Sequence, residues 1–363
     1  MTKSRIHIAT GDPISRRGGL HTVASSIANA QSELGFDSRI VDQINTPYLL
    51  RNFVSYSNYS ALNSTSSKLS YPDSLIEYHF AQTALLTFPL FASKKMPRIF
   101  HFHGPWFLEG KVQGNGSLRA LAKRSVEVIV YRSQAVMTTH SEAFKEVLLE
   151  EFGVPESRVK VVYPGVDLSK FKLRDKEMAR EHFNFSPDKK VILCIRRLEP
   201  RMGIHLAIEA LEHLEDAILV IAGTGSLDNR LRELANSKSY HERIQFLGRV
   251  EEEEHGLLFN AADVVIVPTL SFEGFGLVVW EALASGVPVV ASRVGGLPEA
   301  LGNFRDDFSF ETGSIDDLVE KVNYALNCSK PQATFRAEVI DRTWHKTALE
   351  IESIAERIFG EVD

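Results

Sequence analysis

The sequence is poor in cysteine and contains no long apolar run. Two cysteines in 363 residues, Cys194 and Cys328, exclude a disulfide framework and indicate a reducing compartment. No segment approaches the roughly 18 consecutive apolar residues of a transmembrane helix. The chain begins with a short alternating run and without the apolar stretch of a secretory signal peptide. These absences predict a cytoplasmic protein, with peripheral contact at a membrane as an alternative.

Several ligand-binding patterns are missing as well. The chain has no Asp-x-Asp triplet and no His/Cys cluster at the spacing of metal ligands, so we expect no bound metal. It also lacks the G-x-G-x-x-G fingerprint, so a dinucleotide cofactor and a dehydrogenase are poorly supported. We therefore expect no cofactor, and no nucleic acid among the partners.

The net charge of −6 is unevenly distributed along the chain. Residues 1–170 hold 19 Lys plus Arg against 14 Asp plus Glu, a balance of +5, which leaves −11 for the remainder. A cationic first half and an anionic second half suggest different partners for each. The alternative is an uneven surface charge without functional meaning.

Length and periodicity together predict the fold class. A chain of this length is too long for a typical single core and predicts two domains. In both halves, short apolar runs alternate with helix-like segments, and glycine-containing loops follow several of the runs. We therefore predict an α/β protein with two doubly wound, Rossmann-like domains facing across a cleft, where ligands often bind.

One block of the second half combines anion-binding and hydroxyl-binding groups. The apolar run 264–267 is closed by Pro268, continues through a glycine-containing loop and enters a segment of helix formers. Small residues let a backbone approach a ligand, and the first free amides of a helix favour an anion. Glu273 and Glu281, eight positions apart, lie at either side of these amides. The block suits a ligand that is both phosphate and sugar.

The order of this whole block carries a family resemblance. Gly-Phe-Gly-Leu lies between the two glutamates, Val-Pro-Val-Val-Ala-Ser follows from Val287, and Gly-Gly-Leu-Pro-Glu follows from Gly295. This resembles the signature of retaining glycosyltransferases of the GT-B fold, family 4. The resemblance implies transfer of a sugar from a nucleotide-diphosphate sugar, UDP- or GDP-linked, to an acceptor hydroxyl. The acceptor would be a carbohydrate or lipid-linked molecule, in polysaccharide, glycolipid or glycoconjugate synthesis.

The resemblance also implies domain bounds and residue roles. Residues 1–168 would form the acceptor domain, 169–344 the donor domain, and 345–363 a last helix packed back on the first domain. Glu273 would accept hydrogen bonds from the donor sugar and Glu281 from the ribose. The donor would be bound by Gly18, Gly19, Arg197, Arg201, Gly223, Val250, Glu273, Gly274, Phe275, Gly276, Leu277 and Glu281.

The segment after residues 190–195 departs from the family pattern. Family members show Gly-Arg-Leu, a few variable residues, and Lys-Gly, whose cations bind the donor diphosphate. Here Arg196 replaces the glycine and Met202 stands where the lysine is expected. Because a guanidinium binds phosphate oxygens in bidentate fashion, we predict that Arg197 and Arg201 share the diphosphate. A weakened or lost catalytic site is the competing explanation.

In the first half, a strand over 98–102 is predicted to end at a histidine. The resemblance puts His103 beside the sugar ring and the reacting bond, so that the predicted catalytic residues are His103, Glu273 and Arg197. His101 lies two residues earlier, on the same side of the strand, and competes for that role. We expect the acceptor to be recognised near Trp106, with His101 as a further candidate, and by the segment 45–73.

Two other functions remain open, together with a membrane contact. Nucleotide-sugar epimerases share this fold but need further acid/base carboxylates, which the sequence does not reveal. Met202 also permits a non-catalytic nucleotide-sugar binder. A helix predicted over 118–131 carries Arg119, Lys123 and Arg124, which could contact an anionic membrane or simply form a solvated face.

Overall fold

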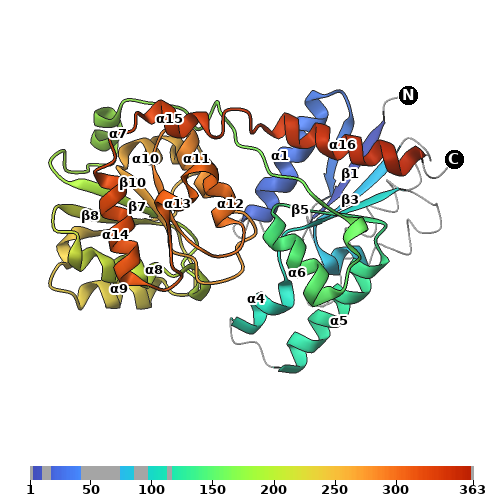
Figure 1. Cartoon of the computed structure of the whole chain (residues 1–363), viewed down its shortest axis with the longest axis horizontal. Coiled ribbons are helices and arrows are strands. Elements are labelled where there is room, and N and C mark those ends of the chain that lie inside the picture. The colour runs from blue at the N-terminus through green and yellow to red at the C-terminus, as the bar shows by residue number, and fades with distance from the viewer. Residues whose placement is uncertain (1–2, 10–17, 42–73, 86–96, 113–116, 361–363) are drawn as a thin grey trace. The chain divides into compact units, whose positions relative to one another are not determined.

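We describe a computed structural model of the chain. The structure describes residues 3–9, 18–41, 74–85, 97–112 and 117–360. The predicted acceptor segment 45–73 lies outside these residues, as does the side chain of Arg119. The chain forms two compact units: residues 1–165 with 343–363 make the first unit, and 166–342 make the second (Figure 1). The sequence analysis placed the boundary at residues 168 and 169.

The first unit is built on a six-stranded parallel sheet with the order β2-β1-β3-β4-β5-β6. The strands are β1 (Ser4–Ile8), β2 (Asp37–Val41), β3 (Ser74–Tyr78), β4 (Arg98–Phe102), β5 (Val136–Thr139) and β6 (Val159–Val161). The helices are α1 (Gly19–Glu33), α4 (Trp106–Val112), α5 (Ser117–Ser133), α6 (Glu142–Phe152) and α16 (Trp344–Gly360).

The two faces of this sheet differ in polarity. Alternate strand residues, such as Ile6, Tyr78 and Phe100, belong to an apolar core. The residues between them include buried polar side chains, among them His7 and Glu77, which are register partners on β1 and β3. Buried polar groups need hydrogen-bond partners. The polar face is therefore the part of the first unit where a network must form.

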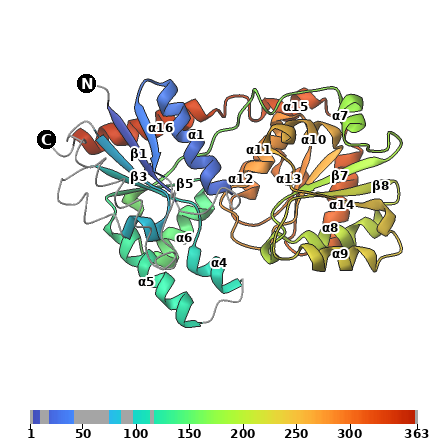
Figure 2. The same cartoon turned by 180° about the vertical axis from the view of Figure 1, so that it is seen from behind.

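The C-terminal helix α16 packs on α1 as part of the first unit (Figure 2). Its Glu352 accepts from buried Arg5 on β1, with Nε to Oε1 at 2.8 Å. Near its start, Thr347 Oγ1 donates to the carbonyl of Tyr163 at 3.0 Å. These hydrogen bonds, together with the packing on α1, attach α16 to the first unit.

The second unit has its own six-stranded parallel sheet, with the order β12-β11-β10-β7-β8-β9. The strands are β7 (Lys190–Ile195), β8 (Ala217–Ala222), β9 (Ile244–Gly248), β10 (Val264–Val267), β11 (Val289–Ser292) and β12 (Ser309–Phe310). The helices are α7 (Lys176–His182), α8 (Ile204–Ala210), α9 (Asp228–Asn236), α10 (His255–Ala261), α11 (Leu277–Ala284), α12 (Leu297–Leu301), α13 (Arg305–Phe308), α14 (Ile315–Leu326) and α15 (Gln332–Ala337).

Both sheets are doubly wound, which confirms the predicted α/β fold class with two Rossmann-like domains. In the first unit β1 lies between β2 and β3, and in the second unit β7 lies between β8 and β10. The order in which the chain adds strands therefore reverses between β1 and β3 and between β7 and β10, and the loops at the carboxyl ends of these strands point apart. Ligands of open α/β sheets bind beside this switch point. The candidate site therefore starts from the loops that follow β7 and β10.

Candidate functional site

The loop after β10 holds Glu273 in a fixed backbone geometry. The amide of Gly296 donates to the Glu273 carbonyl at 2.9 Å. A Cβ on Gly295, whose φ is +53°, would lie 2.0 Å from that carbonyl oxygen, so this position requires glycine. Phe272 has a φ of +52°, which is uncommon for a bulky residue and is typical of functional loops. Arg201 Nη1 donates to the Phe272 carbonyl at 2.9 Å and supports this turn.

Glu273 forms an ion pair with Arg196 from the end of β7. Nη2 of Arg196 contacts Oε2 of Glu273 and also donates to Thr269 Oγ1 at 3.0 Å. The side chains are 7% and 15% exposed, so the pair is largely removed from water. Burial favours a raised pKa for the Glu273 carboxyl, but Arg196 and then Arg201 outweigh it and hold that pKa below its ordinary value. Glu273 is therefore a carboxylate that can accept hydrogen bonds.

The three arginines of this segment have different surroundings. Arg197 is exposed, whereas Arg201 is buried. Arg196 also donates to Met202, with Nη2 to Sδ at 3.1 Å. The structure thus brings together both residues that depart from the family pattern, and it places Arg196, which the sequence analysis did not assign a function, against Glu273. The signal for Arg196 was its charge at a position where glycine was expected.

Glu281 lies on α11, the helix that directly follows the Glu273 loop. The helix begins after Gly276, which has a φ of +86°. Phe275 packs edge-on against Trp280, with ring centroids 4.5 Å apart, and fixes the start of the helix. Glu281 is half-buried, and burial raises its pKa to about 7. Its carboxyl accepts no hydrogen bond from the residues that the structure describes, so it is available to a ligand.

The other predicted donor residues of the second unit line the neighbouring loops. Gly223, with a φ of +132°, follows β8, and a Cβ there would lie 1.9 Å from the carbonyl oxygen of Arg196. This close approach packs the loop after β8 against the loop after β7. The Val250 carbonyl accepts from His255 Nε2 at 3.2 Å. Gly274 and Leu277 are half-buried. Their predicted contacts with a donor stay predictions.

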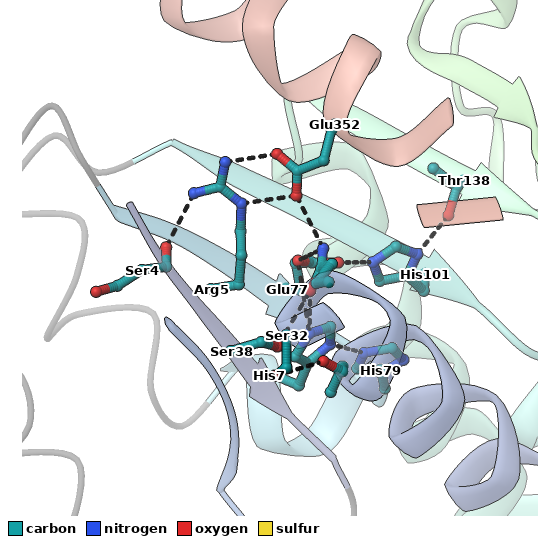
Figure 3. A network of polar contacts seen from close by, with 12 residues as sticks. Ser4, Arg5, His7, Ser32, Ser38, Glu77, His79, His101, Thr138 and Glu352 are labelled. Atoms are coloured by element: carbon teal, nitrogen blue, oxygen red, sulfur yellow. Dashed lines mark hydrogen bonds and ion pairs between the residues drawn. The ribbon is translucent and has the colours of Figure 1, made fainter. Parts of the chain in front are cut away.

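In the first unit, the two candidate histidines have contrasting positions. His101 is 1% exposed, and its ring nitrogens contact Thr138 Oγ1 at 2.6 Å and Glu77 Oε2 at 2.8 Å (Figure 3). This geometry gives His101 a structural role and does not support the predicted acceptor contact. His103 is half-buried, and both its ring nitrogens contact other histidines, His79 at 2.9 Å and His140 at 3.1 Å.

The remaining predicted residues of the first unit lie at helix starts. Gly18 is the N-cap of α1 and Gly19 its first residue, and a Cβ at either would meet no atom within 4 Å. Local packing therefore does not require glycine there. Trp106 begins α4, between Phe80, at 5.2 Å between ring centroids, and the ammonium of Lys123, 4.6 Å from the ring centroid. Its contact with an acceptor stays a prediction.

The described residues contain neither a metal-binding cluster nor a membrane-spanning helix. No group of three or more His, Cys, Asp or Glu side chains in the described ranges is arranged to hold a metal ion. Among the same residues, no helix is long and apolar enough to cross the bilayer.

Comparison with known families gives two adjoining matches. Residues 17–170 match the family described as Glycosyltransferase Family 4, and residues 175–342 match Glycosyl transferases group 1. A D-inositol 3-phosphate glycosyltransferase of Mycobacteroides abscessus is 34% identical over 205 residues, which are 55% of this chain and 46% of that protein. An uncharacterised glycosyltransferase of Methanocaldococcus jannaschii is 32% identical over 214 residues, 57% of this chain and 54% of the other. The chain spans about half the length of these relatives.

Solved structures match over nearly the whole chain at low identity. Sucrose-phosphate synthase from Thermosynechococcus elongatus superimposes with a TM-score of 0.81 at 18% identity, covering 99% of this chain and 100% of that one. Anabaena HepE in complex with UDP and glucose gives a TM-score of 0.77 at 18% identity, with 97% and 99% covered. At this identity the likeness shows the fold alone.

Proposed function

The chain belongs to the family 4, group 1 glycosyltransferases of the GT-B fold, and from this premise we propose that it transfers a sugar from a nucleotide-diphosphate sugar to an acceptor hydroxyl with retention at the anomeric carbon. The observation that carries the proposal is the buried pair of Arg196 and Glu273 beside the switch point of the second sheet. A carboxylate for sugar hydroxyls and a guanidinium for phosphate are adjacent there.

The reaction exchanges one bond at the anomeric carbon. The bond to the departing diphosphate oxygen breaks, the bond to the acceptor oxygen forms on the same face, and the acceptor proton passes to the departing diphosphate. Negative charge grows on the diphosphate as its bond breaks. Arg196, Arg197 and the amides of Gly276 and Leu277 would stabilise that charge, because fixed dipoles and cations need no reorganisation during the step.

We assign Arg196 the role that the family gives to a lysine at position 202. Met202 has no charge to offer a diphosphate, but the Arg196 guanidinium touches its sulfur. Arg201, which the sequence analysis favoured for this role, is buried and supports the Phe272 carbonyl. Before the donor binds, Arg196 pairs with Glu273 and keeps it ionised. When the donor binds, the Arg196 guanidinium would share its hydrogen bonds between the Glu273 carboxylate and the diphosphate.

Two further residues have roles in the proposal, Glu281 toward the ribose and His103 toward the donor sugar. Glu281, half-buried and without a hydrogen-bond partner among the described residues, suits the ribose hydroxyls. His103 would contact the donor sugar through its ring face or its backbone, because neighbouring histidines occupy both its ring nitrogens. We further propose that the reaction needs no metal ion.

The comparisons suggest which substrates to test first. HepE has been seen with UDP and glucose, and the mycobacterial relatives are named for D-inositol 3-phosphate. We propose a UDP- or GDP-sugar as donor and a carbohydrate or lipid-linked acceptor. A peripheral membrane contact through α5 would bring the protein to a lipid-linked acceptor, since Leu121 and Ile129 of that helix are 60% and 59% exposed.

The proposal is tested by nucleotide release. The full chain is incubated with UDP-, GDP- and ADP-sugars, with and without EDTA, and free nucleotide and sugar products are separated. We expect release that the variant Glu273→Gln loses and that Glu320→Gln, an exposed glutamate on α14, retains. A change of sugar without nucleotide loss would indicate an epimerase instead. Donor binding without turnover would indicate a non-catalytic binder, and loss of release in EDTA would overturn metal independence.

A further inference from the structure

Three neighbouring strands of the first sheet each end in a histidine. His79 directly follows β3, His103 follows β4 and His140 follows β5. Because adjacent parallel strands lie about 4.8 Å apart, residues at matching ends become neighbours. The ring centroids of His79 and His103 are 5.2 Å apart, and those of His103 and His140 are 5.0 Å apart. His7, on β1 at the other side of β3, extends the row.

Hydrogen bonds join these four rings into one chain. Nδ1 of His7 lies 3.0 Å from Nε2 of His79, whose Nδ1 lies 2.9 Å from Nε2 of His103. Nδ1 of His103 lies 3.1 Å from Nε2 of His140. Figure 3 shows the inner part of this chain, from His7 to His79, beside Glu77 and Arg5. We call His7, His79, His103 and His140 the histidine chain.

Both ends of the histidine chain face oxygen atoms that can only accept. At one end Nδ1 of His140 lies 3.3 Å from the carbonyl oxygen of Val162. At the other end Nε2 of His7 lies 2.7 Å from the side-chain oxygen of Gln31. The chain therefore has five links, three between rings and two at its ends, and each link needs one hydrogen. Four neutral imidazoles supply only four.

The orientation of the Gln31 amide follows from its other neighbours. Its nitrogen donates to Oε1 of Glu77 at 2.7 Å and to Oε1 of Glu352 at 3.1 Å. Turning the amide around would place its oxygen against both carboxylates. Arg5 fixes the Glu352 carboxylate through two further bonds, so that carboxylate cannot readily accept a proton. The oxygen of Gln31 must then face His7.

Charge balance independently indicates that the histidine chain carries five hydrogens, one more than four neutral rings supply. Glu77 is fully buried, and its ion-pair partners in the described part of the chain are His7 and His101. Arg5 is already paired with Glu352. His101 can satisfy Glu77 as a neutral ring, because the Thr138 hydroxyl can donate to its other nitrogen. A buried carboxylate needs a compensating charge, and the histidine chain is next to it.

We propose that the histidine chain shares one excess proton, held in place by the Glu77 carboxylate, and that this proton can move along the chain to His103. In each position of the proton all five links keep a hydrogen, because a shift of the excess proton from one ring to the next only exchanges donor and acceptor within that link. No proton enters or leaves. His7, His79 and His140 are positioning residues that set the charge of His103.

The groups around the chain decide where the proton resides. Burial lowers the pKa of His79 and His103 well below the ordinary value, and that of His140 to about 4. Burial also lowers the pKa of His7, and Glu77 and Gln31 offset that effect only in part. Of the other groups facing the chain, Arg5, His101 and His21 disfavour a cation, whereas Glu352 is neutralised by Arg5.

Burial would raise the pKa of Glu77, but His7, His101 and Gln31 outweigh it and lower that pKa to about 2. Because Nε2 of His7 lies 3.6 Å from the buried Glu77 carboxylate, the excess proton of the resting protein is centred near His7. His103 is the half-buried member of the chain. A negative charge arriving beside His103 would draw the proton outward. The inference concerns the charge of the first unit and holds whether or not the chain transfers a sugar.

The test is a count of protons on histidine rings, made without any substrate. The full chain is labelled with 15N in the histidine rings, and the ring nitrogens are assigned with single His→Gln variants. At pH 7.5 we expect five of the eight nitrogens of the histidine chain to carry hydrogen, summed over exchanging forms. Four hydrogens on eight nitrogens at this pH would overturn the proposal.

A matched pair of variants tests the role of Glu77. Glu77→Gln removes the compensating charge, so the count at pH 7.5 should fall from five to four. Glu33→Gln, which removes an exposed carboxylate from α1, should leave it at five. An unchanged count in folded Glu77→Gln would contradict the role of that carboxylate. If Glu77→Gln does not fold, the count in the unmodified protein still decides the proposal.

Discussion

Nη2 of Arg196 lies 3.1 Å from Sδ of Met202, so the two positions that depart from the family 4 pattern are in contact. One position has gained a cation and the other has lost one. The same guanidinium nitrogen pairs with Glu273. We therefore propose that the two replacements compensate each other, with the Arg196 guanidinium beside Glu273 supplying the charge that Met202 lacks.

This compensation predicts the outcome of a double-mutant cycle. Arg196→Gly should lower kcat/KM for the donor by more than about tenfold, about 1.4 kcal/mol, because the charge is lost. Met202→Lys should also impair the enzyme, since an ammonium is placed against a guanidinium. The double variant restores the family arrangement and should recover most of the activity. Losses that simply add in the double variant would contradict the compensation.

Arg197 and Arg201 should separate binding from stability. Arg197 is exposed, so Arg197→Ala should raise KM for the donor by about tenfold or more while leaving the melting temperature nearly unchanged. Arg201 is buried and donates to the Phe272 carbonyl, so Arg201→Ala should lower the melting temperature as well as turnover. Thermal unfolding and initial rates measured side by side distinguish the two. An Arg201→Ala protein of normal stability but weak donor binding would instead support the original prediction that Arg201 binds the diphosphate.

Local patterns in the sequence were sufficient to predict many of the strands and helices of the second unit. The apolar run 264–267, the glycines after it and the helix formers beyond predict strand, loop and helix, and the structure confirms them as β10 and α11. Ser141 directly precedes α6, where an N-cap residue is preferred, and its Oγ accepts from the Phe144 amide at 3.1 Å. Such features depend on neighbouring residues, which is why a single sequence reveals them.

The histidine chain could not be predicted because it depends on strand order. His7 and His79 meet only because β1 lies next to β3, although β2 comes between them in the chain. The sequence shows these histidines, but it does not show which strands lie side by side. Similarly, the sequence places Arg196 at the end of β7 without indicating whether its side chain faces solvent, phosphate or Glu273. Long-range contacts of this kind require the assembled sheet.

The membrane contact of α5 is tested by liposome binding. Neutralising Arg119, Lys123 and Arg124 should weaken binding to anionic vesicles, because each basic residue near such a surface contributes attraction. Lys123 also lies over the Trp106 ring, so folding is checked by circular dichroism. A control variant neutralises three basic residues that are exposed elsewhere, Lys160, Lys172 and Arg230. Equal binding by both variants and the unmodified protein would end the membrane proposal.

Acid should destabilise the first unit in a defined pH window. Burial lowers the pKa of His140 to about 4, so below pH 6.5 the unfolded chain binds a proton that the folded ring resists. Stability from this group is complete above pH 6.5 and is lost as the pH falls toward 4, by up to about 3 kcal/mol. His140→Gln should flatten the decline of unfolding free energy in that window, and exposed His213→Gln should not. Parallel curves for all three proteins would show that His140 does not contribute.

Nucleotide binding should release protons from Glu281. Burial raises its pKa to about 7, so near pH 6.5 much of the carboxyl is protonated before a ligand arrives. Ribose hydroxyls that donate to the carboxylate favour the ionised form and lower that pKa, so binding should expel a fraction of a proton. Calorimetry with UDP, GDP and ADP in buffers of different ionisation enthalpy measures this release directly. It should vanish near pH 9, where Glu281 is already ionised, and at pH 6.5 it should be smaller in Glu281→Gln than in Glu320→Gln. Equal release from those two variants would show that the protons come from the nucleotide or from another residue.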